Sequence, residues 1–201
     1  MAKGRGDVIL RDRLQFDVAA GTGNVSLVYG RVDLSDYVSI VKNEGLAIKE
    51  IRFQFRDPNT ALPFPTWMNV ETPVGLSTLD TNEASIRVFA TTTAYELASD
   101  VGIASPNVIC MYERISTCTV AGTPPTHFTI GEYEDHWYGT PDLHPEGYDV
   151  VTDLLIGVTA NGLLNGRLAG NTMELDVMII AEPKKITSKD LTQMLTQAQD
   201  L

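Results

Sequence analysis

Thr172-Met-Glu-Leu-Asp-Val-Met-Ile-Ile-Ala-Glu182 is the stretch of sequence that decides the fold. Its inward-facing set is predicted to be Met173, Leu175, Val177, Ile179 and Ala181. Successive side chains of a β-strand point to opposite faces, so this period of two predicts a strand with one buried face. Glu174 and Asp176 begin the opposite face, and Met178 and Ile180 continue it. That change from polar to apolar indicates that one end of the strand is covered on both sides.

A second long strand is predicted over residues 46–56. Its apolar residues change parity midway, and they are Leu46 and Ile48 followed by Ile51, Phe53 and Phe55. A change of phase at Lys49-Glu50 is what a β-bulge produces, because one extra residue resets which side chains face the core.

Shorter candidate strands lie between and before these two. They are residues 14–18, 25–32, 86–92, 108–119, 127–134 and 150–159. Turn formers such as Gly21-Thr-Gly-Asn24 and Asn161-Gly162 separate them. Long helices do not alternate with these strands, which disfavours a parallel α/β sheet. The predicted fold class is all-β, an antiparallel β-sandwich of jelly-roll type with a short C-terminal amphipathic helix.

The predicted helix occupies residues 188–201. Thr187 or Ser188 is placed to cap it, and Asp190 in the first turn suits the helix dipole. The apolar stripe at helical spacing consists of Leu191, Met194, Leu195, Ala198 and Leu201. So short a helix is marginal alone, hence the stripe must dock on its own sandwich or on a neighbouring copy. We assign these residues to a subunit interface.

Three segments are predicted: a polar, mildly basic N-terminal arm at 1–13, the sandwich at 14–183 and a helical tail at 184–201. The positive charges of the first segment are Lys3, Arg5, Arg11 and Arg13. The segment is either a solvated terminus or a short arm that contacts nucleic acid or a neighbouring subunit. Four such charges neutralise only about four phosphates, so nucleic-acid binding would be weak and sensitive to salt.

Composition narrows the class of protein. At 201 residues the chain fits one domain and can bury a sufficient core without a disulfide or a metal. The formal charge of −11 argues against a dedicated nucleic-acid reader. No apolar stretch is long enough for a signal peptide or a membrane span, which predicts synthesis in the cytoplasm. Cys110 and Cys118 are expected to be reduced structural thiols.

Residues 132–146 contain the densest cluster of potential metal ligands. These are Glu134, Asp135, His136, Asp142 and His144. Their irregular spacing among glycines and prolines predicts a solvated acidic loop rather than a metal site. Trp137, Tyr138 and the following Tyr148 supply apolar area at low entropic cost. We expect them to form an exterior contact loop or a surface on which a sugar stacks.

Sequence motifs for catalysis are few. Gly21-Thr-Gly-Asn24 lacks the third glycine and the following helix of a nucleotide-binding loop. The three histidines suggest no partners for a nucleophilic triad. A carboxylate pair for glycoside cleavage stays open, because its separation is a three-dimensional property. We predict a protein that is not an enzyme and that needs no cofactor or metal.

Together, the basic residues before position 14, the bulged strand, the long loops at 63–73 and 132–146, and the closing strand with its tail resemble one family by their layout. The chain resembles small capsid proteins of icosahedral viruses that are built from a single jelly roll. The resemblance implies eight antiparallel strands in two sheets and assembly of many copies into a closed shell. It also implies an arm and a tail that reach between subunits, and a virion protein synthesised in the host cytoplasm.

The chain departs from that family in its charge. Capsid proteins that package nucleic acid directly often have a long basic arm, whereas here the arm is brief and the body acidic. Weak or no direct contact with nucleic acid is therefore expected, which leaves room for other virion proteins as partners. The competing prediction is a non-catalytic β-sandwich module that recognises carbohydrate or a protein partner through residues 132–146.

Overall fold

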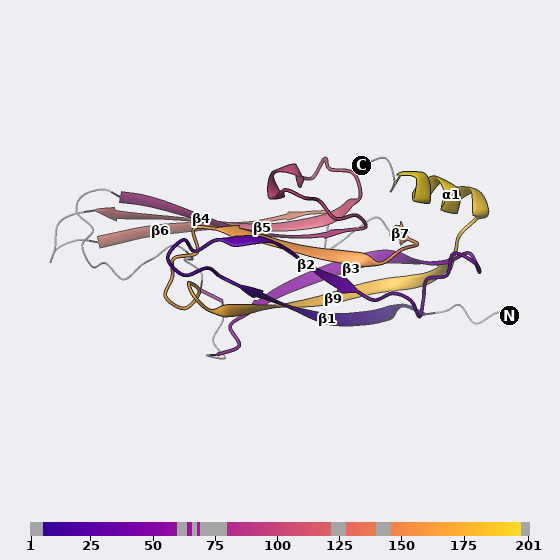
Figure 1. The fold of residues 1–201 in the computed structure, drawn as a ribbon, viewed down its shortest axis with the longest axis horizontal. Helices are drawn as coiled ribbons and strands as arrows, with labels where there is room; N and C mark the ends of the chain where they lie inside the picture. The colour runs from indigo at the N-terminus through magenta and orange to yellow at the C-terminus, as the bar shows by residue number, and fades with distance from the viewer. Residues whose placement is uncertain are drawn as a thin grey trace.

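A computed structural model describes residues 6–59, 64–65, 68, 80–121, 128–139 and 146–197. In this part of the chain, two antiparallel β-sheets face each other and a short helix follows the last strand (Figure 1). The predicted antiparallel all-β architecture with a short C-terminal helix is confirmed. None of the helices in these residues has the length and apolar content needed to cross a membrane.

Sheet A has four strands in the order β1-β9-β3-β7, which are Val8–Asp17, Thr172–Lys185, Glu44–Arg56 and Tyr148–Val150. Sheet B has five strands in the order β2-β8-β4-β5-β6, which are Val25–Val32, Leu154–Asn161, Asp80–Thr91, Val108–Ala121 and Phe128–Tyr138. Every strand pair is antiparallel. A 3-10 turn, η1, spans Ala98–Asp100, and the helix α1 spans Ser188–Gln197.

Strand β9 lies at the centre of sheet A, between β1 and β3. The five inward residues predicted from its alternation are each no more than 3% exposed. The pairing of β3 with β9 shifts register between Ile48 and Glu50, so Lys49 is the extra residue and the predicted bulge is confirmed. The Lys49 ammonium lies 2.7 Å from Asp7 and 2.8 Å from Glu182. The Lys49 side chain thus links β3 to β9 and to the residue that precedes β1.

Both sheets contribute side chains to one core between them. Sheet A supplies Leu46 and Leu175, and sheet B supplies Ile86 and Val158, all fully buried. Burial of this apolar surface is the main favourable contribution to folding. Cys110 and Cys118 are buried free thiols on β5. Burial raises the pKa of the Cys110 thiol to about 12, which keeps it protonated and unreactive at neutral pH.

Two predicted boundaries of the sandwich differ from the structure. β1 begins at Val8, opposite Ala181, so the sandwich starts six residues before position 14, and residues 8–13 are not an arm. The reason is that β9 offers a free ladder to this segment, whose many charged residues conceal its alternation. β9 also continues past Pro183, which pairs with Leu46 of β3. The pairing of β1 does not extend beyond Ala181, so β9 has a free edge at Pro183, and a strand with one free edge tolerates a proline.

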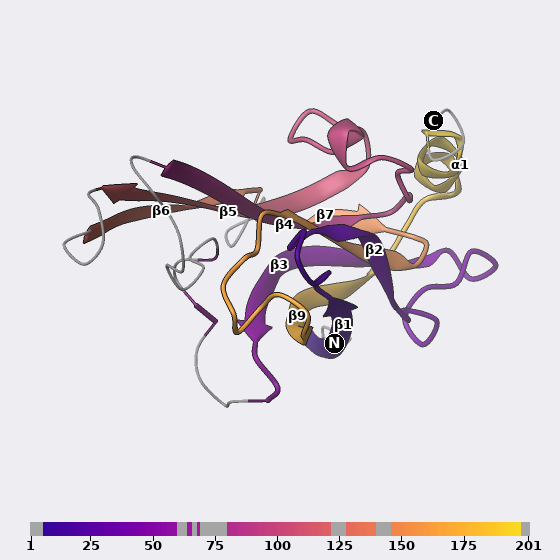
Figure 2. The same ribbon diagram turned by 60° about the vertical axis from the view of Figure 1, so that its left-hand side comes forward.

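Strands β4, β5 and β6 project beyond sheet A at one end of the molecule (Figures 1 and 2). We call this part, residues 80–85, 115–121 and 128–134, the flange. It lies past the end of β8, which pairs with β4 only from Ser85 onward. The flange is therefore a three-stranded sheet whose outer face, directed away from sheet A, extends past the sandwich.

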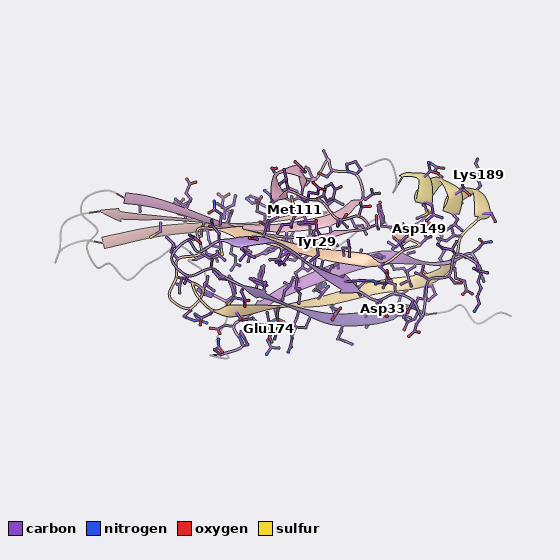
Figure 3. The ribbon with its side chains drawn as sticks, in the orientation of Figure 1. Tyr29, Asp33, Met111, Asp149, Glu174 and Lys189 are labelled. Atoms are coloured by element: carbon purple, nitrogen blue, oxygen red, sulfur yellow. The ribbon has the colours of Figure 1, made fainter. Side chains whose placement is uncertain are left out.

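Nearer the core, the outer face of sheet B is covered by residues 92–107. Tyr29 and Tyr95 hold this segment, because the Tyr95 backbone N–H donates to the Tyr29 hydroxyl at 2.8 Å. Arg87 donates to the carbonyl oxygens of Ala98 and Val101 at 3.4 and 3.1 Å. Met111, which is labelled in Figure 3, belongs to the buried cluster on this covered side of the sheet.

The substitution Gly157→Ala tests the packing of sheet B. An added Cβ would lie 2.6 Å from Cε2 and 2.7 Å from Cε1 of the buried Phe89 ring. We expect the variant to lose about 1–3 kcal/mol of unfolding free energy through overpacking, measured by urea denaturation. Gly166→Ala is the matched control, since no atom lies within 4 Å of its added Cβ. Equal stability of the two variants would contradict the close packing of Phe89 on Gly157.

Candidate interaction surfaces

The predicted loop at 132–146 is a strand over its first half. Residues 132–138 belong to β6, which pairs with β5 along its whole length and forms one edge of sheet B. The strand predicted at 127–134 therefore ends four residues later than expected, because the acidic residues outweighed Tyr133 and Trp137, whose aromatic side chains favour strands. Residues 140–145, with Asp142 and His144, lie outside the described part of the chain.

The three aromatic residues assigned to one contact loop do not lie together. Trp137 and Tyr138 are neighbours in β6 and therefore face opposite sides of sheet B. Tyr138 packs with Phe89 in the covered cluster on the outer face. Tyr148 lies in β7 of sheet A. Only Trp137 remains as a candidate contact residue of the inner face.

Trp137 lies on an aromatic cluster between the two sheets. Its ring centroid is 4.5 Å from that of Tyr112 and 6.1 Å from that of Phe53, with which it stacks nearly parallel. Phe53 belongs to the part of β3 that β7 does not reach, since β7 pairs only with residues 46–48. Trp137 thus covers the open side of the sandwich and is still 41% exposed.

An ion pair lies beside this tryptophan on the same face. Arg114 donates two hydrogen bonds to the Asp135 carboxylate, at 2.6 and 2.7 Å. The Tyr112 hydroxyl also donates to Asp135, at 2.9 Å. The Arg114 guanidinium lies 5.4 Å from the ring centroid of Tyr133, which is 50% exposed. The exposed rings of Tyr133 and Trp137 therefore flank a bidentate Arg114–Asp135 ion pair of fixed orientation.

The hydrogen bonds from Arg114 hold the pKa of Asp135 below its ordinary value, and the same bonds raise the pKa of Arg114. Burial raises the pKa of Tyr112, so its hydroxyl stays protonated as a donor. The charged form of Asp135 is therefore the one that the fold favours.

The substitution Asp135→Asn tests this ion pair through its pH dependence. A lowered carboxyl pKa gives stability that is present above the unfolded pKa of about 4 and is lost as pH falls through the folded pKa. We expect Asp135→Asn to cost about 1 kcal/mol of unfolding free energy at pH 7, a modest value because both groups are partly exposed. The difference from the unaltered chain should shrink below about pH 4. A difference independent of pH, followed by urea denaturation, would contradict the assigned pair.

The outer face of the flange is acidic. Glu83, Glu132 and Glu134 are all exposed on it, and Glu83 and Glu132 lie in one cross-strand row through Thr117. The His136 ring nitrogen Nε2 lies 3.2 Å from the Glu134 carboxylate. Asp135 faces the other way, so the predicted ligand cluster is divided between two faces. Among the residues the structure describes, no three His, Cys, Asp or Glu side chains could hold a metal ion together.

The outer face of sheet A carries arginines. Arg11 and Arg13 lie in β1, and they are joined on this face by Arg52 and Arg56 of β3. We call these four residues the arginine face. Lys3 and Arg5, the other predicted basic residues, lie outside the described part of the chain.

One half of the arginine face is closely paired. The Asp176 carboxylate accepts from Arg13 at 2.6 Å and from Arg56 at 3.4 Å. Glu174 accepts from the Gln15 amide at 3.1 Å and lies within 4 Å of both arginines. Although it points outward (Figure 3), Glu174 is only 6% exposed. The hydrogen bond from Arg13 holds the pKa of Asp176 below its ordinary value.

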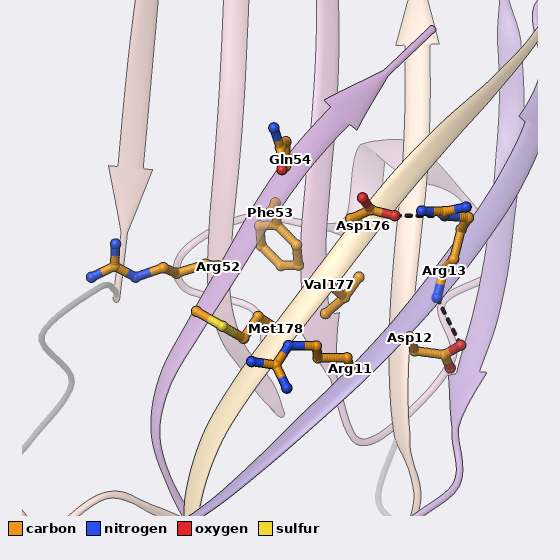
Figure 4. A pocket seen from close by; sticks show the side chains of 9 residues that line it. All are labelled: Arg11, Asp12, Arg13, Arg52, Phe53, Gln54, Asp176, Val177 and Met178. Carbon is orange, nitrogen blue, oxygen red and sulfur yellow. Dashed lines mark hydrogen bonds and ion pairs between the residues drawn. The ribbon is translucent and has the colours of Figure 1, made fainter. Parts of the chain in front are cut away.

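A groove of about 800 Å³ lies on the arginine face and extends from Arg11 and Arg52 to the Arg13–Asp176 pair (Figure 4). Met178 lies in the row Arg11–Met178–Arg52, with one arginine strand on each side. Arg52 contacts Glu50, whereas none of the ion pairs in the described residues involves Arg11. The groove thus combines an apolar floor with two exposed guanidinium groups.

The alternation of β3 alone places Arg52 and Arg56 outward, but it does not connect them with the arginines of β1. The signal lay in the parity of residues 9–15, where Arg11, Arg13 and Gln15 alternate with Leu10 and Leu14. Pairing of this segment beside β9 would have placed all four arginines on one face.

The helical tail packs on its own chain. Thr187 caps α1, because its Oγ1 accepts from the Asp190 backbone N–H at 3.2 Å, as predicted. Leu191 is buried with Val151 and Ile186, and Met194 and Leu195 pack half-buried against them. The described part of the stripe therefore docks on its own sandwich, which is one of the two predicted arrangements, and its assignment to a subunit interface stays a prediction. Ala198 and Leu201 lie outside the described residues.

The substitution Leu191→Ala tests this packing. We expect it to lower the unfolding free energy of the isolated chain by about 2 kcal/mol, because a buried leucine is truncated. The exposed Gln193→Ala on the opposite side of α1 serves as the control and should leave the urea midpoint nearly unchanged. A helix that docks only on a neighbouring copy would make both variants equally stable.

Compared with known proteins, the chain matches no family model and no curated sequence. Its function must therefore be inferred from the topology and from the chemistry of these surfaces.

Proposed function

We propose that the chain is a jelly-roll subunit that assembles with copies of itself into a capsid shell and has no catalytic role. The observation that carries the proposal is the strand pairing. With β6 left aside, the first strand pairs with the last, β2 with β8, β3 with β7 and β4 with β5. A long hairpin rolled into two sheets would have this pattern, which supports a jelly roll of the kind that viral capsid proteins use.

The surfaces support self-assembly rather than a monomer. Lectin and cupin domains share the jelly roll, so the fold alone does not decide the function. Here the flange projects beyond the sandwich with a long edge strand, β6, whose outer side is unpaired in sheet B. Natural proteins usually shield such edges, because unpaired backbone groups attract other chains. The outer faces of the two sheets also carry exposed charges of opposite sign, which favours contact between copies.

The charge distribution also bears on the partners. The arginines of sheet A are mostly paired with carboxylates of the same face, so few remain for phosphates. We infer that direct contact with nucleic acid is weak or lacking in the described part of the chain. Other virion proteins are compatible partners, and the virion would be its location.

Assembly is tested by size-exclusion chromatography with light scattering, followed by electron microscopy of the same fractions. We expect particles of megadalton mass with a regular outline, in equilibrium with smaller species at high dilution. A single monomeric species at every protein concentration and ionic strength would overturn the proposed function.

A second candidate is a carbohydrate-binding module, favoured by one observation. Trp137 and Tyr133 are exposed on either side of the Arg114–Asp135 ion pair, which is an arrangement suited to stacking a sugar ring and orienting its hydroxyls. A monomer that is retained on a glycan matrix, and loses retention on Trp137→Ala, would favour this module over the shell.

A further inference from the structure

We propose that the arginine face of one copy docks on the outer face of the flange of a second copy. The inference rests on the proposed self-assembly and names the two surfaces that would meet. Because these surfaces differ, the contact is head-to-tail and each copy offers one of each to its neighbours.

The first surface is the row Arg11–Met178–Arg52 of sheet A. Arg11 and Arg52 are exposed and lie on strands that are separated by β9 alone. Neighbouring strands are about 4.8 Å apart, so the two arginine backbones are about 10 Å apart. Met178 supplies a half-buried, flexible apolar side chain between them (Figure 4).

The second surface is the row Glu83–Thr117–Glu132 of the flange. Both glutamates are exposed, and β5 alone separates their strands. Their backbones are therefore also about 10 Å apart. Ile115, in the next row on the same face, is half-buried and provides apolar surface beside Thr117. The exposed Glu134 is opposite Ile115 and extends the acidic edge.

The two rows match in spacing and are opposite in charge. Superposed face to face, Arg11 and Arg52 meet Glu83 and Glu132, while Met178 meets Thr117 and the neighbouring Ile115. Charged rims around an apolar centre give an interface both orientation and selectivity. The preference for a bidentate partner makes arginine well suited to such carboxylates.

Contact between the arginine face and the outer face of the flange requires a second copy of the chain. The arginine face points away from sheet B, and the acidic face of the flange points away from sheet A (Figure 1). The two faces therefore cannot meet in one molecule.

Charge reversal tests the proposal. One variant carries Arg11→Glu and Arg52→Glu, a second carries Glu83→Arg and Glu132→Arg, and a third combines all four substitutions. We expect each of the first two to need at least about tenfold more protein to assemble, because two attractions become repulsions. The third variant should recover assembly, since both faces are reversed together. Light scattering against protein concentration measures all three.

Arg31→Glu with Lys189→Glu is the matched control. It changes the net charge as much as the first variant does, but both residues are exposed outside the two proposed surfaces. We expect its assembly to resemble that of the unaltered chain. Circular dichroism and thermal melting verify that each variant is folded. If a charge reversal unfolds the chain, Arg11→Gln with Arg52→Gln replaces it, and assembly should still require more protein.

The outcomes separate the docking inference from the proposed function. Unaltered protein that assembles, together with folded reversal variants that assemble equally well, overturns the docking inference alone. Failure of the folded four-residue variant to recover also overturns it. Unaltered protein that never assembles overturns both proposals.

Discussion

The pairing of β9 with a partner strand on each side is the constraint on which the rest of the structure depends. β9 aligns β1 and β3, and its inward residues form one wall of the core. Because the side-chain period of a strand is two, a slip of one residue would expose that entire wall. The register of β9 therefore determines which residues of β1 and β3 face outward, and so determines the composition of the arginine face.

The sequence was informative where a segment's own pattern sufficed. The inward set of β9, the bulge at Lys49 and the cap at Thr187 follow from local alternation or local hydrogen bonding, and the structure has all three. The failures have a different cause. Residues 8–13 become a strand because β9 pairs with them, and residues 135–138 continue the predicted strand because β5 pairs with them. Partners distant in sequence decided both.

The candidate surfaces were the least predictable part for the same reason. Trp137 was predicted as a contact residue and is exposed. Its neighbours Tyr133, Arg114 and Asp135 could not be predicted, because the register of β5 with β6 brings them together. Likewise, a net charge of −11 conceals the separation of charge between the outer faces. Composition reports a sum, whereas recognition depends on which charges share a face.

At the bulge, the identity of the Lys49 side chain and the presence of a residue at position 49 are separate requirements. Its ion pairs with Asp7 and Glu182 lie at the surface, where such pairs contribute little, so many side chains would serve there. A residue must nevertheless be present at position 49. Loss of that single codon would exchange the buried and solvent-facing sides of residues 50–56 or displace them along β9. Among variants of this chain, position 49 should therefore tolerate many substitutions but no deletion.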